Sequence, residues 1–188
     1  MTELSIFEPD DRAIPYADAG EGPALVLIPG RGSEGGALGT VQEILVEEGF
    51  RVLRVAARRD AGDDEALNDR ADDVLAVMDH VGLEDAWIGG HGFGGTVARA
   101  FAAAHTDRAN GLVLLGVEES DIPLAPLIPV LLVQGSDDDV TPPANGEALR
   151  ATAPERTSIE LMQGAGHLFP ATHPLETAEV IGEYIDWD

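Results

Sequence analysis

Three loops of this chain carry groups that could do chemistry, and each follows an apolar stretch. Residues 135–142 contain Asp138, residues 164–170 contain His167, and residues 90–95 read Gly-His-Gly-Phe-Gly-Gly. A histidine held by a carboxylate can act as a general base, and backbone N–H groups at a sharp turn can stabilise an oxyanion. These three loops are therefore the candidates for a site of general-base catalysis.

The glycine-rich loop has the layout of a nucleophile elbow. The apolar residues 86–89 predict a strand, and the alanine-rich stretch from about Thr96 to His105 predicts a helix. A strand that turns sharply into a helix brings backbone segments close together, and glycine avoids the Cβ clash. At the centre of this turn we expect a strained backbone with positive φ, which Gly92 relaxes.

These loops resemble those of the α/β-hydrolase family, whose elbow reads Gly-x-Ser-x-Gly. Gly90 and Gly94 match its glycines, and Gly92 stands where the family has its serine nucleophile. The family's acid loop, Gly-x-x-Asp-x-x-x-Pro, implies Asp138 as the triad acid, and its Gly-x-Gly-His loop implies His167 as the base. The three loops also arrive in the family's order of nucleophile, acid and base.

The resemblance further implies an oxyanion hole and a small, lidless form of the fold. In the family, one oxyanion N–H follows a His-Gly pair, which here reads Pro29-Gly30, so Arg31 supplies that N–H and Phe93 the other. Residues 58–64 depart from the family's usual Asp-x-Arg-Gly-x-Gly. Residues 117–127 leave no room for the helical lid of many relatives, which predicts an open, shallow pocket.

Without a serine hydroxyl at position 92 no acyl-enzyme can form. Three hypotheses follow. The chain is an esterase-like hydrolase by ancestry that uses His167 and Asp138 on water or an acidic C–H; or it is a non-catalytic protein that binds a small molecule or a partner; or Gly92 replaces a serine of an ordinary hydrolase.

Neighbouring residues leave other assignments open. Asp137 and Asp139 could each displace Asp138 as the acid, and the three acids in a row could also form an acidic turn that caps a helix. Ser33 and Ser136 are the serines nearest the predicted site in sequence, but neither lies on the elbow. His91 occupies a variable position of the elbow, for which we expect no catalytic role.

No cofactor or metal ion is predicted. The chain has no cysteine, and adjacent acids seldom converge on one calcium ion. The glycine-rich residues 29–36 lack the spacing and the lysine of a phosphate-binding loop. Residues 90–95 also match the letters Gly-x-Gly-x-x-Gly, but a dinucleotide fold places that motif on its first strand.

The elements around the loops predict an α/β fold of one domain over residues 1–188, with a mostly parallel, doubly wound sheet flanked by helices and no cap domain. The turn residues 18–23 predict a hairpin between the second and third strands. The helix near residues 65–81 should bury a stripe that includes Val74 and Met78 and expose Asp73, and the last helix should turn Leu175 inward. The expected strands are residues 3–9, 13–18, 24–28, 50–56, 86–89, 111–115, 129–134 and 157–162, and the other expected helices are 38–48, 142–153 and 174–187.

The composition narrows the classes of partner. The chain has 188 residues, 44% of them hydrophobic, and its 35 acids against 11 bases, all arginine, give a net charge of −24. Such a surface repels nucleic acid, favours solubility and suits high salt. No stretch resembles a signal peptide or reaches the length of a membrane helix, so we expect a soluble cytoplasmic protein that binds a small-molecule substrate or ligand. The oligomeric state is not predicted.

Overall fold

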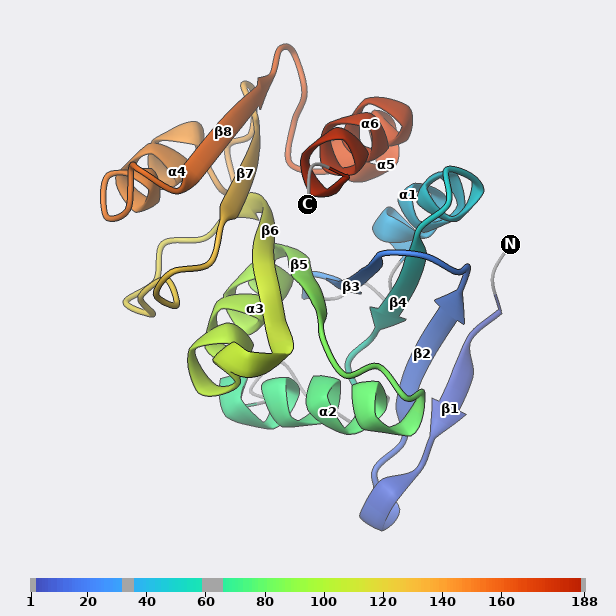
Figure 1. The fold of residues 1–188 in the computed structure, drawn as a ribbon. Coiled ribbons are helices and arrows are strands. Elements are labelled where there is room, and N and C mark those ends of the chain that lie inside the picture. The colour runs from blue at the N-terminus through green and yellow to red at the C-terminus, as the bar shows by residue number, and fades with distance from the viewer. Residues whose placement is uncertain (1–2, 32–35, 59–65, 187–188) are drawn as a thin grey trace.

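An eight-stranded sheet forms the centre of the molecule in the computed structural model, which describes residues 3–31, 36–58 and 66–186 (Figure 1). The strand order is β1-β2-β4-β3-β5-β6-β7-β8. The β1/β2 and β2/β4 pairs are antiparallel and the remaining pairs are parallel. The strands are β1 (Ser5–Phe7), β2 (Ile14–Ala19), β3 (Ala24–Ile28), β4 (Arg51–Val55), β5 (Ala86–Gly92), β6 (Ala109–Val117), β7 (Val130–Gly135) and β8 (Thr157–Met162).

Helices cover both faces of the sheet, which confirms the predicted doubly wound α/β architecture. Figure 1 shows α1, α5 and α6 on one side and α2 and α3 on the other, and α4 packs against β6, β7 and β8. The helices are α1 (Gly36–Glu47), α2 (Leu67–His80), α3 (Phe93–Ala104), α4 (Pro143–Arg150), α5 (Phe169–Thr172) and α6 (Pro174–Ile185), with short 3₁₀ turns η1 (Pro9–Asp11) and η2 (Thr106–Arg108). No helix in the described residues is long and apolar enough to cross a membrane.

The continuous apolar run of β3 is explained by two cores, one on each face. Val26 and Ile28 belong to the core that α2, α3 and α4 cover, whereas Leu25 and Leu27 belong to the core under α1, α5 and α6. Because successive side chains of a strand point to opposite faces, a strand buried on both sides must be apolar at every position. The predicted bounds of β3 and β8 agree with the structure.

The turn at residues 18–23 is present, but it does not close a hairpin. Strand β4 lies between β2 and β3 in the sheet, so the strands that flank this turn do not pair. Gly20 has a φ of +87°, and a Cβ there would lie 2.2 Å from the carbonyl oxygen of Phe50. The glycine therefore serves the close approach of this turn to the start of β4 and not a two-residue hairpin.

Two side chains lie opposite to the prediction. Asp73 on α2 is only 1% exposed, because its carboxylate accepts from Arg12 at 2.7 Å and from Arg58 at 2.6 Å. Removal of the carboxylate from water costs free energy, and the two arginine cations compensate for that cost. Leu175, which we expected to face inward with Ile181 and Ile185, is 56% exposed, whereas Ile181 and Ile185 are buried as predicted, together with Ala178.

The link between β6 and β7 contains no helix. All of residues 118–129 are described, and apart from a bend at Asp121 and a turn at residues 126–127 they are irregular. The absence of an inserted helical lid at this point agrees with the prediction. Parallel neighbours are usually joined through a helix, whereas an irregular segment joins β6 to β7 here.

Candidate active site

Gly92 ends β5 with a φ of +55° and a ψ of −118°, and α3 begins at the next residue, Phe93. This is the positive φ that the sequence predicts for the elbow. The helix begins three residues earlier than predicted, so Gly94 and Gly95 lie inside it. Tertiary packing here outweighs the low helix propensity of glycine.

The flanking glycines are sterically required. A Cβ at Gly90 would lie 2.2 Å from the carbonyl carbon of Gly94, and one at Gly94 would lie 2.0 Å from the carbonyl oxygen of Ile28. Contacts this short cannot be relieved by a side-chain movement, because backbone atoms make them. The position at Gly92 is open by comparison, since a Cβ there would meet only His167, at 3.5 Å from Cε1 and 3.6 Å from Nε2.

The structure brings His167 and Asp138 together at this edge of the sheet. His167 Nδ1 lies 3.0 Å from Asp138 Oδ2, and the side chains are 23% and 0% exposed. Asp138 is the one of the three successive acids that contacts His167, while Asp137 and Asp139 lie at the surface. The imidazole therefore meets the buried carboxylate through Nδ1 and faces Gly92 through Nε2.

Thr141 completes the hydrogen bonds of the carboxylate. Its hydroxyl donates to Asp138 Oδ2 at 2.7 Å and lies 3.0 Å from His167 Nδ1, and its backbone N–H donates to Asp138 Oδ1 at 2.8 Å. Val140 N–H donates to the same oxygen at 2.9 Å. Burial alone would raise the pKa of Asp138, but the hydrogen bonds from Thr141, His167 and Val140 outweigh it and lower that pKa. The carboxylate is thus held in its charged form.

Thr141 was not predicted as part of the site. The sequence does hold a signal, because a threonine three residues after an aspartate often closes a local hydrogen-bonded turn with that carboxylate. Gly116, with a φ of +65°, packs beside this group, and a Cβ there would lie 2.8 Å from Thr141 Oγ1. Position 116 must therefore stay small for the acid loop to close.

His91 packs against His167 and holds it by a hydrogen bond. Its ring is 3% exposed, its Nε2 lies 2.7 Å from the carbonyl oxygen of His167, and the two rings stack with centroids 4.5 Å apart. A carbonyl oxygen can only accept, so Nε2 of His91 carries the proton. Burial of the ring lowers the pKa of His91, which favours the neutral imidazole. His91 thus fixes the loop and the ring plane of His167.

The predicted oxyanion residues lie side by side. The guanidinium carbon of Arg31 lies 3.6 Å from the centroid of the Phe93 ring. Phe93 is the first residue of α3, and backbone N–H groups in the first turn of a helix lack intrahelical acceptors. A negatively charged oxygen at this helix end would be stabilised by those groups and by the helix dipole.

Of the two serines considered as replacement nucleophiles, Ser136 lies in the described residues, and its hydrogen bonds are made to residues other than His167. Ser136 Oγ accepts from the backbone N–H of Gly164 at 2.7 Å, which gives it a structural role between two loops. Ser33 lies outside the described residues. Within the ranges 3–31, 36–58 and 66–186, no group of three or more histidine or acidic residues could hold a metal ion.

With this geometry in view, the family comparison is clear. Residues 24–170 match the family model described as "Alpha/beta hydrolase family", which covers well over half of the chain. The chain belongs to the α/β-hydrolase family.

Two curated relatives, both from Comamonas testosteroni, are hydrolases. The chain is 29% identical over 125 residues to 2-hydroxy-6-oxo-6-phenylhexa-2,4-dienoate hydrolase, covering 62% of this chain and 44% of that protein. It is 31% identical over 108 residues to 2-hydroxy-6-oxononadienedioate/2-hydroxy-6-oxononatrienedioate hydrolase, covering 53% and 38%. The matched segments thus span less than half the length of either relative.

Solved structures of hydrolases share the fold. An esterase from Thermogutta terrifontis superposes with a TM-score of 0.85 at 20% identity, over 98% of each chain. A meta-cleavage product hydrolase from Pseudomonas fluorescens IP01 gives a TM-score of 0.85 at 16% identity, over 97% of each chain. At these identities the likeness shows the fold alone.

Proposed function

We propose that this protein is an esterase-like hydrolase of small acyl substrates in which His167 activates water directly, with Gly92 at the position of the family's serine nucleophile. The observation that carries the proposal is the acid–base pair, in which buried Asp138 places Oδ2 3.0 Å from His167 Nδ1 and the imidazole faces a position with no side chain. The hydrolase relatives of this chain support the reaction class.

The mechanism has one covalent step fewer than that of a serine hydrolase. Water occupies the space that a side chain at position 92 would fill, and His167 Nε2 takes a proton as the water oxygen attacks the acyl carbon. Asp138 stabilises the imidazolium that forms. The N–H groups of Arg31 and Phe93 stabilise the tetrahedral oxyanion, and His167 returns the proton to the departing alkoxide.

The expected activity is modest. In subtilisin, removal of the triad side chains lowers turnover by on the order of 10⁶ and leaves about 10³–10⁴ over water from the oxyanion hole and binding. A general base adds about 10²–10⁴ to such a background. Activated short-chain esters are therefore the substrates on which activity should first be detected.

The test measures hydrolysis of nitrophenyl acetate and nitrophenyl butyrate by the unsubstituted protein and by the His167→Ala variant. We expect slow turnover without a burst phase and without labelling by a fluorophosphonate, and a fall of about 10²-fold or more in His167→Ala. His173→Ala, a histidine of the α5–α6 junction away from Gly92, is the matched control. Equal turnover in the chain and His167→Ala would refute the proposal.

The second candidate is a binding protein that retains the pocket of a hydrolase. The lack of a nucleophilic side chain at Gly92 favours it, because a ligand ester would then remain intact. Turnover no faster than in buffer, together with saturable binding of an intact ester in calorimetry, would place this role first.

A further inference from the structure

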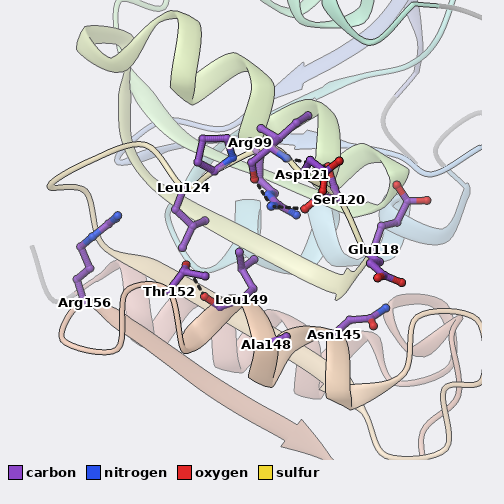
Figure 2. A pocket seen from close by; sticks show the side chains of 13 residues that line it. Arg99, Glu118, Ser120, Asp121, Leu124, Asn145, Ala148, Leu149, Thr152 and Arg156 are labelled. Atoms are coloured by element: carbon purple, nitrogen blue, oxygen red, sulfur yellow. Dashed lines mark hydrogen bonds between the residues drawn. The ribbon is translucent and has the colours of Figure 1, made fainter.

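A hollow of about 510 Å³ lies between α3, α4 and the segment after β6 (Figure 2). The helix-free segment that joins β6 to β7 forms one of its walls. Its volume falls within the range of small-molecule sites in proteins, about 300–1,000 Å³. No residue in its lining belongs to the Asp138–His167 pair.

The middle of the hollow is apolar, and hydrogen bonds tie one of its walls to α3. Ile122 and Leu124 line it from the segment after β6, and Leu149 lines it from α4. The guanidinium of Arg99 on α3 is buried and donates to the carbonyl oxygens of Ser120 and Ile122. These hydrogen bonds hold the segment against α3, so the hollow does not depend on a ligand to stay open.

The charges of the lining do not favour an ion of either sign. Three carboxylates (Glu118, Glu119 and Asp121) oppose two guanidinium groups (Arg99 and Arg156). In a chain of net charge −24, a further negative charge would also be repelled over longer range. An uncharged apolar chain matches this lining best.

One end of the hollow lies next to the candidate active site. Gly92 pairs with Val117 across the β5/β6 ladder. The side chain of Asn145 donates to the carbonyl oxygen of Val117 at 3.0 Å. Glu118 accepts from Thr96, on the first turn of α3, at 2.7 Å. Both Glu118 and Asn145 line the hollow, and Figure 2 shows them together at the end opposite to Arg156.

We infer that this hollow binds the non-reacting end of the substrate, an uncharged apolar chain of medium length, while the reacting carbonyl lies between Gly92 and His167. The inference rests on the proposed function for the position of the carbonyl. The apolar chain of the substrate runs past Val117, between Glu118 and Asn145. Its far end packs against Ile122, Leu124 and Leu149. Each buried methylene then raises affinity about threefold to fourfold.

Methyl alkyl ketones test this binding without any hydrolysis, because they carry the carbonyl but no leaving group. Calorimetry should show dissociation constants that fall about threefold per methylene from the ethyl to the octyl ketone. Ala148→Phe fills the hollow from an exposed position of α4, and Thr152→Phe is a second filling variant. Both should weaken the octyl ketone at least tenfold and leave the ethyl ketone unchanged.

Ala151→Phe is the matched control, since Ala151 is exposed beside the same helix and does not line the hollow. An octyl ketone carrying a terminal carboxylate should bind more weakly than the uncharged one. The inference would be overturned if the dissociation constants fell equally with the length of the alkyl group in the unsubstituted protein and in both filling variants. Tighter binding of the ketone that carries a carboxylate would also overturn it. Loss of ester turnover with this dependence intact would refute only the hydrolytic function.

Discussion

Asp138 and Gly92 face the same imidazole, but the protein holds them in different ways. Asp138 is fixed by its side chain, which accepts hydrogen bonds from Thr141, Val140 and His167. Gly92 is fixed by its neighbours, because Gly90 and Gly94 pack backbone against backbone with no space for a Cβ. The elbow therefore keeps its shape without any side chain at its centre.

This contrast explains how the centre of the elbow can be glycine while the acid and base remain ordered. A non-glycine residue at a φ of +55° would cost about 1–3 kcal/mol, and glycine avoids that cost. Loss of a side chain around Asp138 would bring no such gain in stability, because it would leave the buried carboxylate or the Thr141 hydroxyl with fewer hydrogen bonds.

The sharpest test of the contrast restores a hydroxyl at the empty position. We expect Gly92→Ser to react with a fluorophosphonate and to raise ester turnover on the order of 10² or more, because a complete triad exceeds its serine-free form by far. Gly92→Ala is the control, since it adds the same strained Cβ without the oxygen. Both variants should lose about 1–3 kcal/mol of stability in urea titrations. Labelling of neither variant would show that the site is not built for acyl transfer.

A smaller effect on activity is expected from a change in the hydrogen bonds around Asp138. Thr141→Val keeps the shape of the side chain and the backbone hydrogen bond to Asp138 but removes the hydroxyl that bridges Asp138 and His167. Loss of a hydrogen bond to a charged group should cost about 1.5–3 kcal/mol of stability and about tenfold in turnover of the Gly92→Ser form. Thr106→Val removes a hydroxyl bonded to Ala102 on the far end of α3 and serves as the control. Equal losses in both variants would contradict a role of Thr141 in placing the pair.

The smallest effect concerns the pH dependence of stability. The pKa of buried His91 lies below the usual 6.5, so between 6.5 and that lower value the unfolded chain binds a proton that the folded chain does not. The contribution of His91 to stability is complete above pH 6.5 and is lost as the pH falls through this window.

His91→Phe should therefore flatten the decline of unfolding free energy below pH 6.5, as measured by urea titration at several pH values. The same series on His173→Phe corrects for the loss of a histidine outside the site. An unchanged decline in His91→Phe would show that His91 is not held neutral.

Most of the fold and the candidate site could be predicted because the signals are local. Strand β3 is a bare apolar run between glycine-rich turns, and Asp138 and His167 each lie in a loop directly after a strand. Their convergence follows from the parallel sheet, whose strands end at one edge.

The predictions from sequence were wrong where contacts between residues distant in sequence determine the local structure or burial. The early start of α3 depends on the fit of Gly94 against Ile28, and the burial of Asp73 depends on Arg12, which lies 61 residues away. The short helix α5 after His167 begins beside Pro170 and was not predicted. Neither the periodicity nor the residue types of these segments carry that information.

The helix-free crossover also bears on the order in which the sheet assembles. Leu112 pairs with Val130, only 18 residues later, whereas Leu25 must find Trp87, 62 residues away, to join β3 to β5. The entropy of closing the longer loop exceeds that of the shorter by about 1 kcal/mol. Because contacts close in sequence form fastest, we expect β6/β7 to form first among the parallel strand pairs and β3 to join β5 last.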